Sequence, residues 1–168
     1  VREGAFADLV LFDAGRIERR RGAEVAADAR LTVVETVVFG RVAMGERVAS
    51  GALVDHWRIR RAGRLAFADS FSVSGDVGAL MAGRATGSGA RAVSTFLHMA
   101  PDAADHLDRI RAALDNAAAE SGVEAGATAF DGLLVVRLIS PSPQALRGEL
   151  VRFLEIFRAG PLPRPWSC

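Results

Sequence analysis

A glutamate, Glu35, stands in the middle of an apolar strand face, where a carboxylate is unexpected. Residues 31–39 read LTVVETVVF, and a period of two places Glu35 on the same face as Leu31, Val33, Val37 and Phe39. Burying an ionised carboxylate costs several kcal/mol unless a cation, a proton or several hydrogen bonds compensate it. The pattern therefore predicts a partner for the charge of Glu35.

Two further carboxylates, Asp55 and Asp69, occupy the same kind of position in a predicted β-hairpin. Its arms are residues 53–61 and 64–73, and each arm alternates apolar and polar residues. A three-residue loop over residues 61–63 keeps apolar residues opposite one another, and it sets Asp55 directly opposite Asp69. Two carboxylates at that distance cannot both ionise at low cost without a proton, an arginine or a metal ion between them. The hydrophobic pairs of this register are Ile59 with Leu65, Trp57 with Phe67, and Leu53 with Phe71.

Glu35, Asp55 and Asp69 are together our candidates for a seam that passes or briefly holds a divalent cation. Oxygen ligands, with few histidines and no internal cysteine, suit weak and exchangeable metal binding better than a closed site. Other readings stay open: the faces are solvated, or each carboxylate pairs with a buried arginine. The arginines considered for that role are Arg41, Arg58 and Arg137. A further alternative uses Asp55 and Asp69 as the acid and base of a hydrolase.

The remaining candidate residues carry weaker signals. Glu46 lies in a Gly-Glu dipeptide, and its carboxylate suits either a metal or the capping of backbone amides in a turn. His56 neighbours Asp55 but points to the opposite strand face. His98 and His106 are lone imidazoles, which are typical of packed or surface positions. The sequence contains no Ser-His-Asp order, CxxC pair or HExxH motif.

Composition argues against several functional classes. The formal net charge of +1 gives no electrostatic footprint for nucleic acid or an anionic membrane, although all 21 basic residues are arginine. The only cysteine is Cys168, so the chain has no internal disulfide. No apolar run approaches the roughly 18 residues that a membrane helix needs. The first residues, VREG, lack the layout of a signal peptide, and we expect a cytoplasmic protein.

The pattern of the chain predicts a mainly β fold with two α-helices (α+β), built on an antiparallel β-sheet scaffold with hairpins. Both helices fall in the C-terminal half, one over residues 101–122 and the other over residues 142–160. Between them an Asp-Gly turn predicts a second hairpin over residues 124–140, whose second strand is apolar on both faces and therefore central. We expect residues 1–168 to form a single domain.

An ordered series of residues through the middle of the chain, together with its tail, resembles the urease accessory protein UreD family, also called UreH. The series begins with VVFGR at residues 37–41 and closes with PRPW at residues 163–166. Between them lie Ala43, Gly45, Glu46, Gly51, Asp55, Trp57, Arg58, the run GRL at residues 63–65, Ala68 and Asp69. By this resemblance the chain corresponds to the C-terminal portion of the family and lacks the family's N-terminal strands.

The resemblance implies a urease maturation factor that catalyses nothing itself. Members of the family bind the urease apoprotein, recruit the helical protein UreF and the GTPase UreG, and help nickel to reach the buried active site through an internal tunnel. No tightly bound cofactor is expected, and neither nucleic acid nor a membrane is an expected partner. The expected transient nickel route consists of Glu35, Glu46, Asp55 and Asp69. Strand periodicity gives three of these residues, and the resemblance gives Glu46. A β-rich interaction module without a metal remains an alternative.

Overall fold

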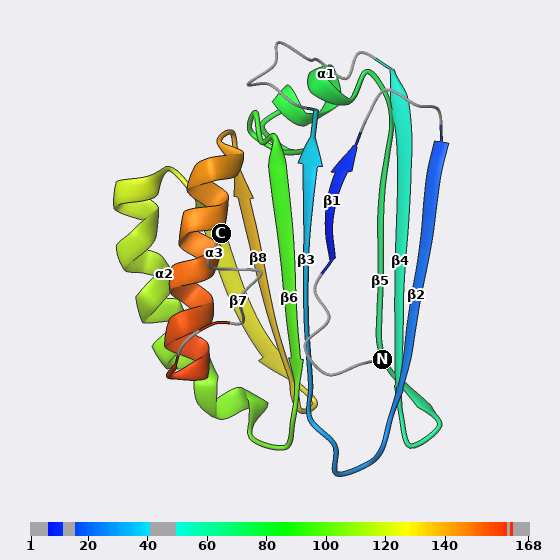
Figure 1. The fold of residues 1–168 in the computed structure, drawn as a ribbon, viewed down its shortest axis with the longest axis vertical. Helices are drawn as coiled ribbons and strands as arrows, with labels where there is room; N and C mark the ends of the chain where they lie inside the picture. Colours follow the sequence, from blue (N-terminus) through cyan, green and yellow to red (C-terminus); the bar gives the residue numbers. More distant parts are fainter. Residues whose placement is uncertain (1–6, 12–15, 41–49, 161, 163–168) are drawn as a thin grey trace.

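Two β-sheets and a pair of helices form three layers in the computed structural model, which describes residues 7–11, 16–40, 50–160 and 162 (Figure 1). A five-stranded sheet is the middle layer. Helices α2 (Leu107–Ser121) and α3 (Pro143–Arg158) cover one face of it, and a three-stranded sheet covers the other. The mainly β, α+β fold class predicted from the sequence is confirmed.

The five-stranded sheet has the order β1-β3-β6-β8-β7. Its strands are β1 (Ala7–Leu11), β3 (Leu31–Phe39), β6 (Ala92–Met99), β7 (Glu124–Phe130) and β8 (Leu133–Ser140). The predicted hairpin of residues 124–140 is present, and Asp131 and Gly132 both take the positive φ that a tight hairpin turn requires. β8 lies between β6 and β7, in agreement with the hydrophobic residues on both of its faces.

The three-stranded sheet has the order β2-β4-β5, formed by β2 (Arg16–Val25), β4 (Gly51–Arg61) and β5 (Arg64–Gly75). Pairing is antiparallel except that β1 pairs parallel with β3 and β2 pairs parallel with β4. The two parallel pairs result from the connectivity, since the strands from β1 to β4 alternate between the two sheets. Each strand therefore returns to its sheet in the direction of the strand two places before it, instead of turning back in a hairpin.

The hairpin of β4 and β5 has a different register from the predicted one. Its loop is Ala62 and Gly63 alone, with φ of 49° and 77°, as in the type I′ turn whose twist suits a hairpin. A register shift beside Ile59 and Arg60 then accommodates one extra residue on β5. This bulge, rather than a longer loop, returns the apolar residues of β5 to the inward face. The observed pairs are Ile59 with Phe67, Trp57 with Asp69, Asp55 with Phe71, and Leu53 with Val73. The prediction that Asp55 lies directly opposite Asp69 is wrong.

Local sequence signals set most helix ends. The Ser142 side chain accepts a hydrogen bond from the backbone N–H of Ala145 at 3.1 Å, and Gly122 ends α2 with a φ of 66°. The segment predicted as the first turn of α2 instead contains the 3₁₀ helix η2 (Ala103–His106), and a short helix α1 (Val77–Ala82) follows β5. Among the described helices, none is long and apolar enough to cross a membrane.

An aromatic cluster joins the helix layer to the middle sheet. The ring of Phe96 on β6 lies 4.9 Å, between centroids, from the rings of both Phe153 and Phe157 on α3. Phe96 and Phe153 are fully buried. Edge-to-face contacts of this kind add to the free energy gained by removing the rings from water, so Phe153 is a principal contact of α3.

Replacing Phe153 with alanine is expected to lower the free energy of unfolding by about 3–5 kcal/mol, because the change removes buried hydrocarbon and leaves a cavity. Phe130→Ala is the matched control. Phe130 is 46% exposed, and its truncation should cost less than about 1 kcal/mol. Urea unfolding followed by circular dichroism measures both, and equal losses would be incompatible with the buried position of Phe153.

Candidate functional site

Glu35 and Asp55 meet between the two sheets, where one indole N–H holds them both. Each residue is 4% exposed, so the inward positions predicted from the alternation are confirmed. Nε1 of Trp57 donates to Oδ2 of Asp55 at 2.7 Å and to Oε2 of Glu35 at 3.1 Å. Because β3 belongs to one sheet and β4 to the other, this shared donor connects the two sheets.

The two carboxylates bring two acidic groups to one buried donor. An indole offers a single N–H, which donates a hydrogen bond but does not neutralise a carboxylate. Two ionised carboxylates that approach the same nitrogen repel each other, and surroundings of low polarity strengthen that repulsion. A proton or a cation shared by Glu35 and Asp55 relieves it.

The third predicted residue, Asp69, has a guanidinium partner. Arg137 Nη2 on β8 donates to Asp69 Oδ2 at 2.5 Å, and the two side chains are 54% and 31% exposed. The pair is a second polar connection between the sheets, because β8 and β5 lie in different sheets. An ion pair so accessible to water contributes about 0–1 kcal/mol. The arginine alternative is thus confirmed for Asp69, with Arg137 as the partner.

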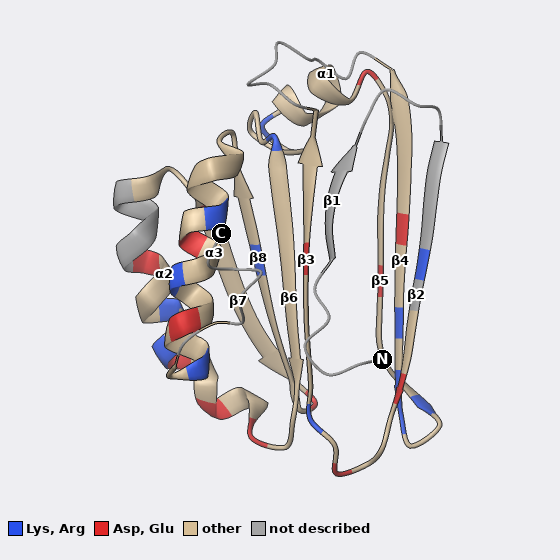
Figure 2. Ribbon diagram, viewed as in Figure 1, with Lys and Arg blue, Asp and Glu red and all other residues tan. Residues whose placement is uncertain are grey.

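We call the set of Glu35, Asp55 and Asp69 the acidic seam. Figure 2 shows the acidic positions of β3, β4 and β5 at a similar level along the strands. On either side of this level the space between the sheets is apolar, and the hydrophobic residues form two separate clusters. One cluster includes Val37, Phe39, Leu53 and Val73, and the other includes Trp57, Ile59, Phe67 and Leu97. The acidic seam therefore divides the core between the sheets into two apolar parts.

The other residues predicted around the seam do not join it among the described residues. Arg58 is exposed, and its position in the alternation turns it to the face of β4 opposite Asp55. His56 also faces away from Asp55, as predicted. Glu46 and Arg41 lie outside the described residues, and the structure does not place them.

The described part of the chain contains one group of metal-ligand side chains within mutual reach, and sequence reasoning treated its histidines as isolated. One potential ligand atom from each of His98, Asp102 and His106 lies within 4.8 Å of the others. His98 packs against Phe157 of α3, so the group lies on the face of the middle sheet opposite the acidic seam. The available signal was the spacing of four residues between members, which the end of β6 and the turn into η2 fold into a cluster.

Burial and neighbouring charges set the protonation of this group. Burial, with a contribution from His106, lowers the pKa of His98 from 6.5 to about 4, so its imidazole is neutral at pH 7. Its Nδ1 lies 2.8 Å from Oγ1 of Thr32. Arg30 contacts the two oxygens of Asp102 at 2.6 and 2.9 Å, and this hydrogen bonding holds the pKa of Asp102 below its usual range and raises the pKa of Arg30.

Comparison with known proteins identifies the family. The family model described as UreD urease accessory protein matches residues 7–167. The chain belongs to the UreD family of urease accessory proteins. The resemblance carried by the residue series from VVFGR to PRPW is thereby confirmed.

Curated UreD proteins share nearly half of their aligned residues with this chain. Urease accessory protein UreD from Methylobacterium sp. (strain 4-46) is 49% identical over 161 residues, which cover 95% of this chain and 57% of that protein. Urease accessory protein UreD 2 from Methylorubrum populi is 48% identical over 160 residues, with 95% and 53% covered. Urease accessory protein UreD from Xanthobacter autotrophicus is 44% identical over 160 residues, with 95% and 54% covered. The chain spans about half the length of these UreD relatives.

Trp57→Phe removes the N–H that holds two carboxylates of this UreD chain and keeps an aromatic ring beside Phe67. We expect the free energy of unfolding to fall by about 1–3 kcal/mol, because buried acceptors lose their donor. Urea unfolding measures the change. The same substitution in an Asp55→Asn background should cost less, since one of the two charged acceptors is already neutral, and identical costs in both backgrounds would count against the role of the N–H.

The low pKa of His98 predicts that this UreD chain loses stability in acid. The folded-state pKa of about 4 lies below the ordinary value of 6.5, so the unfolded chain takes up the proton first. The free energy of unfolding should therefore fall as the pH drops from about 6.5 to about 4, by at most about 3 kcal/mol from this group. Urea unfolding across this range should show a flatter profile for His98→Gln and an unchanged profile for His56→Gln. Parallel profiles for the parent and His98→Gln would show that protonation of His98 does not cause the loss of stability in acid.

Proposed function

We propose that this chain is a urease maturation factor, a scaffold without catalytic activity that binds the urease apoprotein together with UreF-like and UreG-like partners. Membership of the UreD family over residues 7–167 carries the proposal, since the curated relatives are named urease accessory proteins. The outer faces of α2 and α3 offer helical surface for these partners, opposite the strands that bury the acidic seam.

The proposal includes a route for nickel along the acidic seam. Two of its carboxylates are buried and the third lies nearer the surface, so oxygen ligands follow one another from the core outward. Among the described residues these three side chains are not gathered into one compact group of ligands. Separated oxygen ligands without thiolates bind divalent ions weakly, as release to the next site requires. Glu46 joins the route by family resemblance alone. Nickel is cargo here, and no tightly bound cofactor is proposed.

The hydrolase alternative has lost the geometry on which it depended. It required Asp55 and Asp69 to face each other as an acid and base pair. Asp55 is instead opposite Phe71, and Asp69 is engaged by Arg137. Carboxyl groups that cooperate in hydrolysis must flank the bond that is cleaved.

A β-rich interaction module without a metal is the second candidate, and one observation favours it. Arg137 supplies the guanidinium that this candidate expects beside Asp69. In such a module the seam carboxylates would be structural, and removal of their charge would leave urease maturation unaffected. The two candidates therefore differ in one measurable consequence of neutralising the seam.

The variants Glu35→Gln and Asp55→Asn test whether urease maturation needs the charge of the acidic seam. Each substitution keeps the shape of the side chain and an oxygen for the Trp57 N–H, while it removes one negative charge. In cells whose urease cluster carries this chain as its UreD protein, we expect the nickel content and activity of urease to fall about tenfold or more. Asp131→Asn is the matched control, because it makes the same chemical change at an exposed turn.

Partner binding is scored separately from nickel delivery. A UreF-like protein should co-purify equally with the parent chain and with both variants, since the altered side chains are buried. Full nickel loading by Glu35→Gln and Asp55→Asn would refute the nickel route and favour the module without a metal. A parent chain that retains neither the UreF-like protein nor urease would refute the scaffold role.

A further inference from the structure

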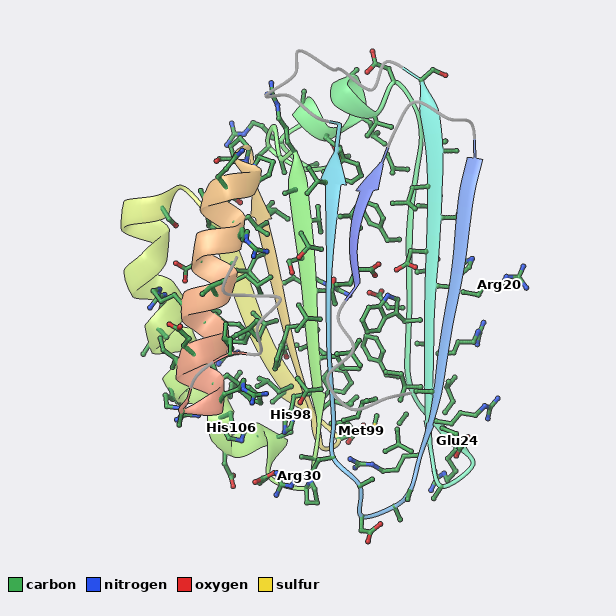
Figure 3. All side chains as sticks on the ribbon, viewed as in Figure 1. Arg20, Glu24, Arg30, His98, Met99 and His106 are labelled. Carbon is green, nitrogen blue, oxygen red and sulfur yellow. The ribbon has the colours of Figure 1, made fainter. Side chains whose placement is uncertain are left out.

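A second cluster of polar side chains lies on the helix-facing side of the middle sheet. His98 belongs to β6, His106 belongs to η2 and Asp102 lies between them, and one potential ligand atom from each lies within 4.8 Å of the others. Figure 3 shows His98 and His106 close together at the end of the sheet near Arg30. Their ring centroids are 5.8 Å apart. None of these residues takes part in the proposed function.

One ring nitrogen of His98 has the setting of a metal ligand. The residue is 6% exposed, and its Nε2 is buried without a hydrogen-bond partner. Its Nδ1 lies 2.8 Å from the hydroxyl of Thr32. When Nδ1–H donates to that hydroxyl, Nε2 carries a lone pair and no proton. Metal-binding histidines use this arrangement, in which an oxygen holds the second ring nitrogen and fixes both tautomer and ring orientation.

Asp102 and His106, the other two members of the cluster, each form a hydrogen bond with an arginine. Arg30 contacts both oxygens of Asp102, and Arg109 Nη2 donates to Nδ1 of His106 at 3.1 Å. The Arg30 side chain is 57% exposed, and a pair so accessible to water holds its partner only weakly. A metal ion can therefore displace the arginines at small cost, and Arg30 competes with it for Asp102.

We propose that His98, Asp102 and His106 bind a divalent transition-metal ion of the kind represented by Zn²⁺ and Co²⁺. Two imidazole nitrogens and one carboxylate oxygen suit such ions, whereas Ca²⁺ and Mg²⁺ favour oxygen ligands alone. The ring of Phe157 lies 4.9 Å from that of His98 and 5.2 Å from that of His106, and it shields one side of the site from water. Three protein ligands leave a coordination position for water or for a group from a partner.

Calorimetric titration of the purified full chain with Zn²⁺ tests the proposal. The absorption spectrum of bound Co²⁺ reports the ligand geometry. We expect one ion per parent chain. His106→Gln and Asp102→Asn should each weaken binding about tenfold or more, because each removes a ligand. His56→Gln is the matched control, since it alters the remaining histidine of the 3 in the chain and should bind like the parent.

Arg30→Gln separates a metal site from mere packing of polar side chains. Removal of the competing guanidinium should tighten Zn²⁺ binding several-fold, an effect that a purely structural cluster does not produce. The matching substitution Arg58→Gln, at an exposed position of β4, should leave the affinity unchanged.

Thermal unfolding in the presence of a chelator establishes that each variant is folded. If His98→Gln does not fold, Asp102→Asn and His106→Gln still test the metal site, because Asp102 and His106 are only half-buried. The proposal is overturned if the parent binds no Zn²⁺, or if both variants bind it as tightly as the parent. Loss of binding in His56→Gln would overturn it equally, since the ion would then lie elsewhere.

Discussion

The structure depends on the indole N–H of Trp57, which holds Glu35 of one sheet and Asp55 of the other. Hydrophobic contact between two sheets is not directional, and by itself it tolerates many relative positions. A buried hydrogen bond is directional, and a carboxylate that loses its donor in the core is costly. The apolar clusters above and below the acidic seam supply most of the stabilisation, whereas the indole selects the alignment of the sheets at which both carboxylates have a donor.

The middle sheet keeps two kinds of polar chemistry apart. Thr32 and Glu35 are three residues apart on β3, and an odd separation turns them to opposite faces of the strand. Thr32 contacts the imidazole of His98 beneath the helices, and Glu35 contacts Trp57 between the sheets. The middle sheet itself, with β3, β6 and β8 side by side, lies between them. The acidic seam therefore lies on one face of this sheet, and the cluster of His98, Asp102 and His106 lies on the other.

The features that sequence reasoning recovered depend on neighbours along the chain. The inward positions of Glu35 and Asp55 follow from strand periodicity, and the Asp131-Gly132 turn follows from two residues that accept positive φ. The register of β4 and β5 did not follow, because the bulge beside Ile59 is selected by packing against the other sheet. The cluster of His98, Asp102 and His106 was equally hidden, since it exists only once a strand end and a 3₁₀ turn adopt their geometry.

The alternation of β1 to β4 between the two sheets has a consequence for how the molecule forms. Neither sheet can be completed from a continuous stretch of chain, because β3 pairs with β1 and with β6, and β2 pairs with β4 across the intervening β3. Contacts of such sequence separation are made slowly, since loop closure costs entropy before any contact is gained. Until the late strands arrive, the early ones expose unpaired edges that a neighbouring polypeptide can occupy. During folding, pairing with the protein's own distant strands therefore competes with pairing to strands of other polypeptides.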